Sequence, residues 1–373
     1  MEHFLILSHL DGLLIYLLSL ILGQRKLKVE TLLPLGKLDP GLKAPDAGLE
    51  YGSIASDAQL VDRLGYHSLL MEETKDDPFQ ILSLAASQTS KVKLGTSVAI
   101  AFARSPFTLA QSAWTAHKIS GGRFELGVGS QVKGHIRRRH GMQWHPPGPW
   151  MKDYVGALRA IWRSWQNEEP LEYESKHYKL NLNVPLFTPS PMDHAPIPIH
   201  LAAVNPGMFD VACEIAEGVR LHPVCGVKYI SEVLMPRIKS RGTGEFEVCL
   251  KPLVATAQDE EGLVARKEVA RERLAFYLST PAYARAFEVY QLQDLCQQMN
   301  QLSRTNQWSE MSKLVSDELL EEIVIVALYD ELASKIKDRF RSVLDRIEVS
   351  IPINNRQDEE VLSQIIVDLR TTK

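Results

Sequence analysis

The sequence predicts an α/β protein folded as a (β/α)₈ TIM barrel, and three features of the chain indicate this fold. The 373 residues provide enough chain for one large barrel with insertions. From residue 27 onward, short β-branched or aliphatic runs alternate with longer amphipathic stretches, as in repeated βα units on a parallel sheet. Eight such strands with eight crossovers close a barrel better than they fit a doubly wound sheet.

Each expected strand is a short run of aliphatic or β-branched residues, and a stretch with helical periodicity follows it. The expected strands are 29–33, 68–72, 92–99, 123–128, 197–202, 218–222, 246–254 and 346–351. The expected helices are 55–64, 79–89, 109–119, 151–166, 208–217, 229–240, 260–277 and 330–344.

Local residue pairs support these boundaries. Asp77 and Pro78 together are typical of a helix N-cap followed by proline in the first helical position. Gly121 and Gly122 end one helix and permit the tight turn into the next strand. Two segments exceed a minimal barrel: 167–194, with a hairpin expected around 173–182, and 278–314. Because insertions on barrels commonly shape the substrate entrance, we expect both at the C-terminal face.

The first 26 residues form an apolar extension, and residues 27–373 form a single barrel domain. The apolar run is split by Asp11 and Gly12, which leaves roughly half of the 20 residues needed to span a bilayer. Glu2 stands where a signal peptide would carry basic residues. Residues 1–24 therefore either pack on the domain or contact a membrane, and their length and charge favour the first.

Composition narrows the functional class. With 42 basic and 46 acidic residues, the net charge of −4 gives no general attraction to nucleic acid, so the expected partner is a small molecule. The four cysteines contain no C-x-x-C pair, which argues against zinc ribbons and a disulfide framework and fits a cytoplasmic location. No spacing of His, Asp and Glu resembles a metal site, so we expect no metal. We also expect a homo-oligomer.

Candidate proton-transfer groups come from the strand ends, because barrel enzymes place their chemistry in the loops after the strands. Glu73 follows the second strand among other carboxylates, a setting that suits a general base but that structural ion pairs share. His222, after the sixth strand, and His135 are the histidines best placed to move a proton. His200 lies within the alternating pattern of the fifth strand, where we expect it to be buried and hydrogen-bonded.

Small residues on two strands could admit a flat ring. The third strand and its continuation contain Ser97 and Val98 among alanines, although small side chains also simply fill barrel layers. Gly127 and Gly129 would let a cofactor approach the main chain before Gln131. They do not form a Rossmann fingerprint, because the third glycine is missing.

Two further segments suit an anion. Ala203, Val204 and Asn205 lead directly into a helix whose N-terminal amides could hold a phosphate, unless Asn205 only caps that helix. A basic run from residue 133 to 140 includes Arg137, which either faces solvent or, with Arg104, grips the anionic tail of a cofactor.

Four of these segments together resemble the bacterial luciferase-like superfamily, and above all its branch of deazaflavin (coenzyme F-420)-dependent oxidoreductases. The segments are 95–98, 123–129, 151–162 and 197–206, and the similarity runs from about residue 27 to 351. The resemblance implies a luciferase-like barrel that binds a flavin-like ring against the third strand, over a cis peptide assigned by position to Ser97-Val98. It also implies a phosphate near Ala203, Val204 and Asn205, and a ring pocket lined by residues 127–131.

The implied activity is hydride transfer between coenzyme F-420 (8-hydroxy-5-deazaflavin) and a small organic substrate. A histidine common in relatives after the second strand is replaced here by Glu73 or Thr74, and a common glutamate after the fourth-strand glycines by Gln131. Two alternatives remain: a monooxygenase that uses reduced FMN on the same barrel, and a non-catalytic flavin-binding barrel.

Overall fold

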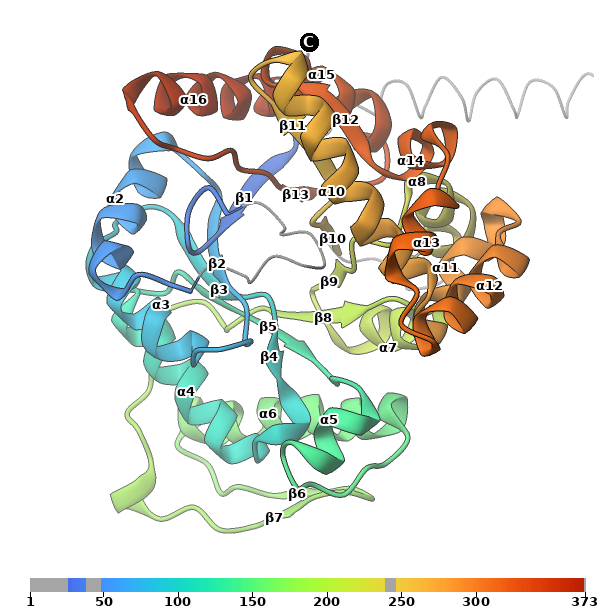
Figure 1. Cartoon of the computed structure of the whole chain (residues 1–373). Helices are drawn as coiled ribbons and strands as arrows, with labels where there is room; N and C mark the ends of the chain where they lie inside the picture. The colour runs from blue at the N-terminus through green and yellow to red at the C-terminus, as the bar shows by residue number, and fades with distance from the viewer. Residues whose placement is uncertain (1–25, 38–47, 239–245, 372–373) are drawn as a thin grey trace, which may run out of the picture.

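The computed structural model describes residues 26–37, 48–238 and 246–371, which form a closed parallel barrel surrounded by helices (Figure 1). The strands follow one another in the order β3-β2-β1-β13-β10-β9-β8-β5-β4, and a β3–β5 pairing closes the ring. The predicted (β/α)₈ fold is confirmed. The barrel strands are β1 Lys28–Leu32, β2 Ser68–Met71, β3 Lys93–Thr96, β4 Ala99–Ile100, β5 Phe124–Gly129, β8 Ile199–Ala203, β9 Gly218–Leu221, β10 Glu247–Leu250 and β13 Arg346–Glu348.

The third barrel strand is interrupted at the point where the resemblance placed a cis peptide. The Ser97-Val98 bond is cis and separates β3 from β4. Both parts still pair with β5, β3 through Leu94↔Phe124 and β4 through Ala99↔Val128. The backbone between them therefore leaves the sheet at the C-terminal end of the barrel.

Helices occupy the eight predicted positions, with the expected caps where the sequence supplied them. The Asp77 carboxylate accepts from the backbone N–H groups of Phe79 and Gln80, at 2.9 and 3.3 Å. The bounds are α2 Ile54–Leu64, α3 Pro78–Ser87, α4 Pro106–Ile119, α6 Pro147–Asn167, α7 Pro206–Ile215, α10 Glu260–Leu278 and α15 Tyr329–Phe340. At the sixth position, predicted as 229–240, a continuous run combines α8 Val227–Tyr229, η4 Ile230–Leu234 and α9 Met235–Ile238.

The predicted strand 246–254 is wrong, because it merges two strands of different sheets. β10 belongs to the barrel, whereas β11 (Val254–Ala257) pairs in parallel with β12 (Ile325–Leu328) in a separate sheet. Pro252 lies between them and offers no N–H for a continuous ladder. Strand β12 and the C-terminal helix α16 (Arg356–Arg370) were not predicted.

The first insertion contains the predicted hairpin, which packs along α6. Strands β6 (Tyr173–Glu174) and β7 (Lys179–Leu180) are antiparallel. The Trp150 indole N–H donates to the Tyr178 hydroxyl at 2.7 Å and thereby fastens the hairpin to α6. The second insertion is helical: η5 Pro281–Tyr283, α11 Ala284–Phe287, η6 Glu288–Tyr290, α12 Gln293–Arg304, α13 Trp308–Lys313 and α14 Asp317–Ile323.

Charged side chains fill the inside of the barrel. Arg346, with 2% of its surface exposed, donates to Glu30, Glu125 and Glu247. Burial alone would raise the pKa of Glu30, but Arg220 and Arg346 outweigh it and lower this pKa to about 2. His200 is fully buried as predicted, with Nε2 3.4 Å from a Glu247 oxygen.

Across the part of the chain that the structure describes, no helix is long and apolar enough to cross a membrane. The predictions for residues 1–24 fall outside the described residues.

Candidate active site

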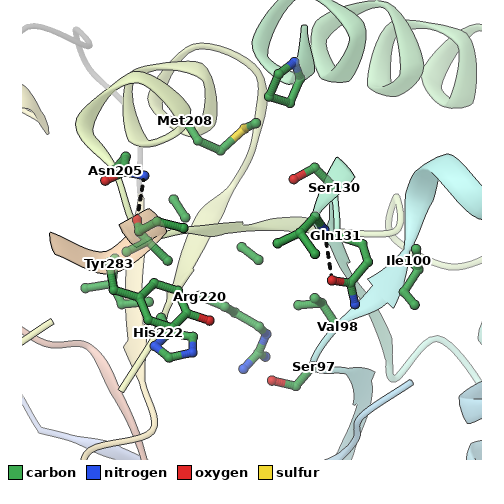
Figure 2. Close-up of a pocket in the computed structure, with 18 of the residues that line it drawn as sticks. Ser97, Val98, Ile100, Ser130, Gln131, Asn205, Met208, Arg220, His222 and Tyr283 are labelled. Atoms are coloured by element: carbon green, nitrogen blue, oxygen red, sulfur yellow. Dashed lines mark hydrogen bonds between the residues drawn. The ribbon is translucent and has the colours of Figure 1, made fainter. Parts of the chain in front are cut away.

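A cavity of about 1070 Å³ opens at the C-terminal ends of the barrel strands, where the barrel fold predicts a site. Residues at and after the ends of several barrel strands form its walls, together with residues of the second insertion (Figure 2). Ala282 and Tyr283 of that insertion line the cavity, whereas no described residue of the segment 167–194 lines it. The first insertion therefore supports α6 from outside rather than shaping the cavity.

Ser97 and Val98 line the cavity at the cis peptide, where the sequence places them, and Ile100 extends the same wall. Gly127 does not line the cavity, and this corrects its assignment as a cofactor contact. A Cβ atom at Gly127 would lie 2.0 Å from the Thr96 carbonyl oxygen, and one at Gly129 would lie 2.8 Å from Val98 Cγ2. The two glycines thus let β5 pack against the back of this wall.

Glu73 lines the cavity with both carboxylate oxygens engaged. Oε2 accepts from the Ile100 backbone N–H at 2.7 Å, and Oε1 accepts from Arg104. Arg104 also donates to Asp77 at 2.9 Å, so it is held by carboxylates instead of being aimed at a cofactor anion. Glu73 is placed to hold the wall formed by β4, which is a positioning role.

His222 lines the cavity beside the rings of Tyr277 and Tyr283. Its Nδ1 accepts from the Val224 backbone N–H at 3.3 Å, so a neutral imidazole carries its hydrogen on Nε2. Its ring centroid lies 4.4 Å from that of Tyr283 and 5.0 Å from that of Tyr277. His222 is therefore both oriented and shielded at the cavity wall.

The basic run lies apart from this cavity. His135 and Arg137 are exposed on α5 (Lys133–Arg138), and neither lines the large cavity. Arg137 and Lys133 instead line a second hollow of about 540 Å³ together with Trp144. The structure therefore does not bring His135 to the candidate site.

The start of α7 faces the cavity through Ala203, Val204 and Asn205. The alternative that Asn205 only caps this helix is not seen: its side chain makes no cap hydrogen bond, and its amide nitrogen donates to the Ala282 carbonyl at 3.2 Å. The other amide atom, Oδ1, is buried without a hydrogen-bond partner. Across the cavity lies Gln131, with φ at 54° and its side-chain oxygen on the Val132 N–H at 2.8 Å (Figure 2).

Arg220 is a charged cavity residue that was not among the candidates from the sequence. It lies on β9, is 7% exposed and extends into the cavity between His222 and Ser97 (Figure 2). Glu30 accepts from it at 3.0 and 3.4 Å. An arginine inside an otherwise buried strand was the available signal. Among the described residues, no group of three or more His, Cys, Asp or Glu could hold a metal ion.

Comparison with known proteins agrees with this fold. Residues 37–346 match the family described as luciferase-like monooxygenase. An uncharacterized Mycobacterium tuberculosis protein is 34% identical over 355 residues, which cover 93% of this chain and 99% of the relative.

Two other similar proteins carry a functional description. A putative coenzyme F-420-dependent oxidoreductase of M. tuberculosis is 26% identical over 79% of this chain and 88% of its own length. The coenzyme F-420-dependent tetrahydromethanopterin reductase of Methanopyrus kandleri shares the fold, with a TM-score of 0.69, 20% identity, and coverage of 92% of this chain and 98% of that chain. The chain belongs to the luciferase-like monooxygenase family and is an oxidoreductase of that family.

Proposed function

We propose that this protein transfers a hydride between coenzyme F-420 and a small organic substrate. The observation that carries the proposal is one cavity that combines an apolar wall at Val98 with the N-terminal end of α7. The similarity to a putative F-420-dependent oxidoreductase supports the choice of cofactor.

The residues present fit a phosphorylated flavin-like cofactor. A Cβ atom at Gly207 would meet nothing within 4 Å, so the first turn of α7 leaves room beside its backbone for a phosphate. The unpartnered Asn205 Oδ1 offers an acceptor to a hydroxyl of the cofactor chain. The cavity is at the upper end of the usual size for a ligand site, which leaves space for a substrate beside the ring.

When bound, the deazaflavin supplies the carbon that donates or accepts the hydride, and the protein supplies orientation and a proton. Val98 and Ile100 would support the ring, with Ser97, Gly129 and Gln131 around it, while Glu73 fixes that wall through the Ile100 amide. Ala203, Val204 and Asn205 would hold the phosphate.

Two further residues would act around the ring. His222 Nε2 would move the proton, and Tyr283 would exclude water above it. Arg137, which lines the second hollow, would contact only an extended anionic tail of the cofactor. We propose no role for His135, because it is exposed on α5.

The test is a titration of the purified protein with F-420 and with FMN, each followed by fluorescence. We expect tighter binding of F-420, about tenfold weaker binding in Asn205→Ala, and turnover that consumes no oxygen. Selective binding of FMN with oxygen consumption would instead identify a monooxygenase. Tight binding without turnover of any donor or acceptor would identify a non-catalytic barrel.

A further inference from the structure

The floor of the candidate site contains a buried guanidinium that is only partly satisfied by the protein. Glu30 accepts from the two terminal nitrogens of Arg220, and Nε of Arg220 is buried without a partner. A guanidinium has five N–H groups in a fixed plane, so two contacts to one carboxylate leave donors in need of acceptors. A buried donor without an acceptor is costly and marks a place where a ligand completes the site.

The charge on Arg220 is also only partly balanced. Its counter-ion Glu30 is shared, because Glu30 accepts from Arg346 at 3.0 Å as well. Burial disfavours the charged form of Arg220, but Glu30 outweighs this effect and raises its pKa above the usual value, so the group stays cationic. The cavity thus has a fixed positive charge in its floor, close to the wall formed by Ser97 and Val98 (Figure 2).

We propose that Arg220 donates hydrogen bonds to the ring of the bound cofactor and thereby favours its reduced, anionic form over its oxidised form. This inference rests on the proposed function in assuming a deazaflavin or flavin ring. Both ring systems carry a pyrimidinedione edge, and the reduced anion concentrates negative charge at N1 and the C2 carbonyl. A fixed cation with free N–H donors is complementary to that edge, and charge near N1 is one of the means by which proteins tune such rings.

The experiment compares the dissociation constants of the oxidised and the reduced cofactor, measured without oxygen. Wild-type protein should bind the reduced form more tightly. Arg220→Met should lose about tenfold or more of the affinity for the reduced form and less than about twofold for the oxidised form. A tenfold selective loss corresponds to a fall of about 30 mV in the two-electron potential of the bound cofactor. Arg220→Lys should lie between the two.

The matched control is Arg237→Met, which removes the same charge from an arginine paired with Asp210 on the outside of the barrel. It should leave the ratio of the two dissociation constants unchanged. An equal loss of both affinities in Arg220→Met, or no loss, would overturn the inference and leave Arg220 as a structural partner of Glu30.

Misfolding of the variants and a different cofactor can both be distinguished from a failure of the inference about Arg220. If circular dichroism shows that neither Arg220 variant folds, the wild-type ratio decides, and tighter binding of the oxidised form rejects the inference. If the protein binds FMN selectively, the proposed function fails while the same ratio, measured with FMN, still tests Arg220. If it binds neither cofactor, both proposals are wrong.

Discussion

At the scale of single residues, the wall around Val98 depends on the absence of one side chain. Gly127→Ala would place a Cβ atom 2.0 Å from the Thr96 carbonyl oxygen, which is backbone and cannot rotate away. We expect a loss of at least about 3 kcal/mol in the free energy of unfolding, because strands β3 and β5 must separate locally. Urea denaturation followed by circular dichroism measures this loss.

Gly52→Ala is the matched control, since a Cβ atom there would meet nothing within 4 Å. It should change the free energy of unfolding by less than about 1 kcal/mol. Equal stability of the two variants would contradict the packing role that the structure gives Gly127.

Single residues also show which parts of the site could be predicted from the sequence and which could not. Ser97, Val98, Asn205 and His222 were placed correctly at the cavity because barrel loops after strands form the site. The function of Gly127 could not be predicted, because a glycine that admits a cofactor and one that admits a neighbouring strand look alike in sequence. The role of Arg220 could not be predicted from the sequence either. Its counter-ion Glu30 lies 190 positions away along the chain, and only the folded barrel brings the two side chains together.

At the scale of elements, the loop after β2 is tied to the segment between β4 and α4 by the Glu73–Arg104 pair. The side chains are mostly buried, at 14% and 16% exposure, and Arg104 continues to Asp77 at the start of α3. Glu73→Gln keeps the shape but loses the charge that Arg104 pairs with. We expect a double-mutant cycle with Arg104→Met to give a coupling free energy of about 1–3 kcal/mol, measured by urea denaturation.

Lys152→Met and Glu214→Gln form the comparison cycle, because this pair is exposed on the surface. Its coupling should be below about 1 kcal/mol. If the Glu73 cycle gave no more than this exposed pair, the link between the loop after β2 and the wall would not matter for stability.

Elements were predicted best where one sequence run makes one element. The eight crossover positions followed from helical periodicity, and Asp77 marked the start of α3. The predicted strand 246–254 failed because β10 and β11 are adjacent in sequence but join different sheets. β11 pairs with β12, about 70 residues along the chain, and such a long-range pairing leaves no local signal.

At the scale of the whole molecule, the barrel is closed around an ion network rather than a purely aliphatic core. Arg346 joins glutamates from β1, β5 and β10, and Arg220 shares Glu30 with it. The network is continuous from the barrel interior to the floor of the cavity. Glu30 neutralises part of the positive charge of both arginines. It therefore couples the stability of the barrel to the positive charge that Arg220 presents to a ligand.

This network makes the stability of the protein depend on acidic pH. Arg220 and Arg346 overcome the effect of burial and lower the pKa of Glu30 from 4.5 to about 2, and the pKa values of Glu125 and Glu247 are lowered as well. A carboxylate whose pKa is lowered by folding stabilises the folded protein at pH values above the pKa that it has in the unfolded chain. This stabilisation is lost as the pH falls through the lower pKa of the folded state. Burial and Arg346 lower the pKa of His67 to about 4, so its contribution declines earlier, below pH 6.5.

We therefore expect the free energy of unfolding to fall below pH 6.5 and more steeply between about pH 4.5 and 2, where Glu30 alone accounts for about 3 kcal/mol. Urea denaturation at pH 7, 5, 4 and 3 measures this profile.

Glu30→Gln should lose about 3–5 kcal/mol at pH 7, because two buried arginines lose a shared counter-ion. The variant should retain the decline between pH 6.5 and 4.5 while flattening the steeper part. Parallel profiles for the two proteins would mean that Glu30 does not titrate with folding, and Glu30 would then not be an origin of the acid sensitivity.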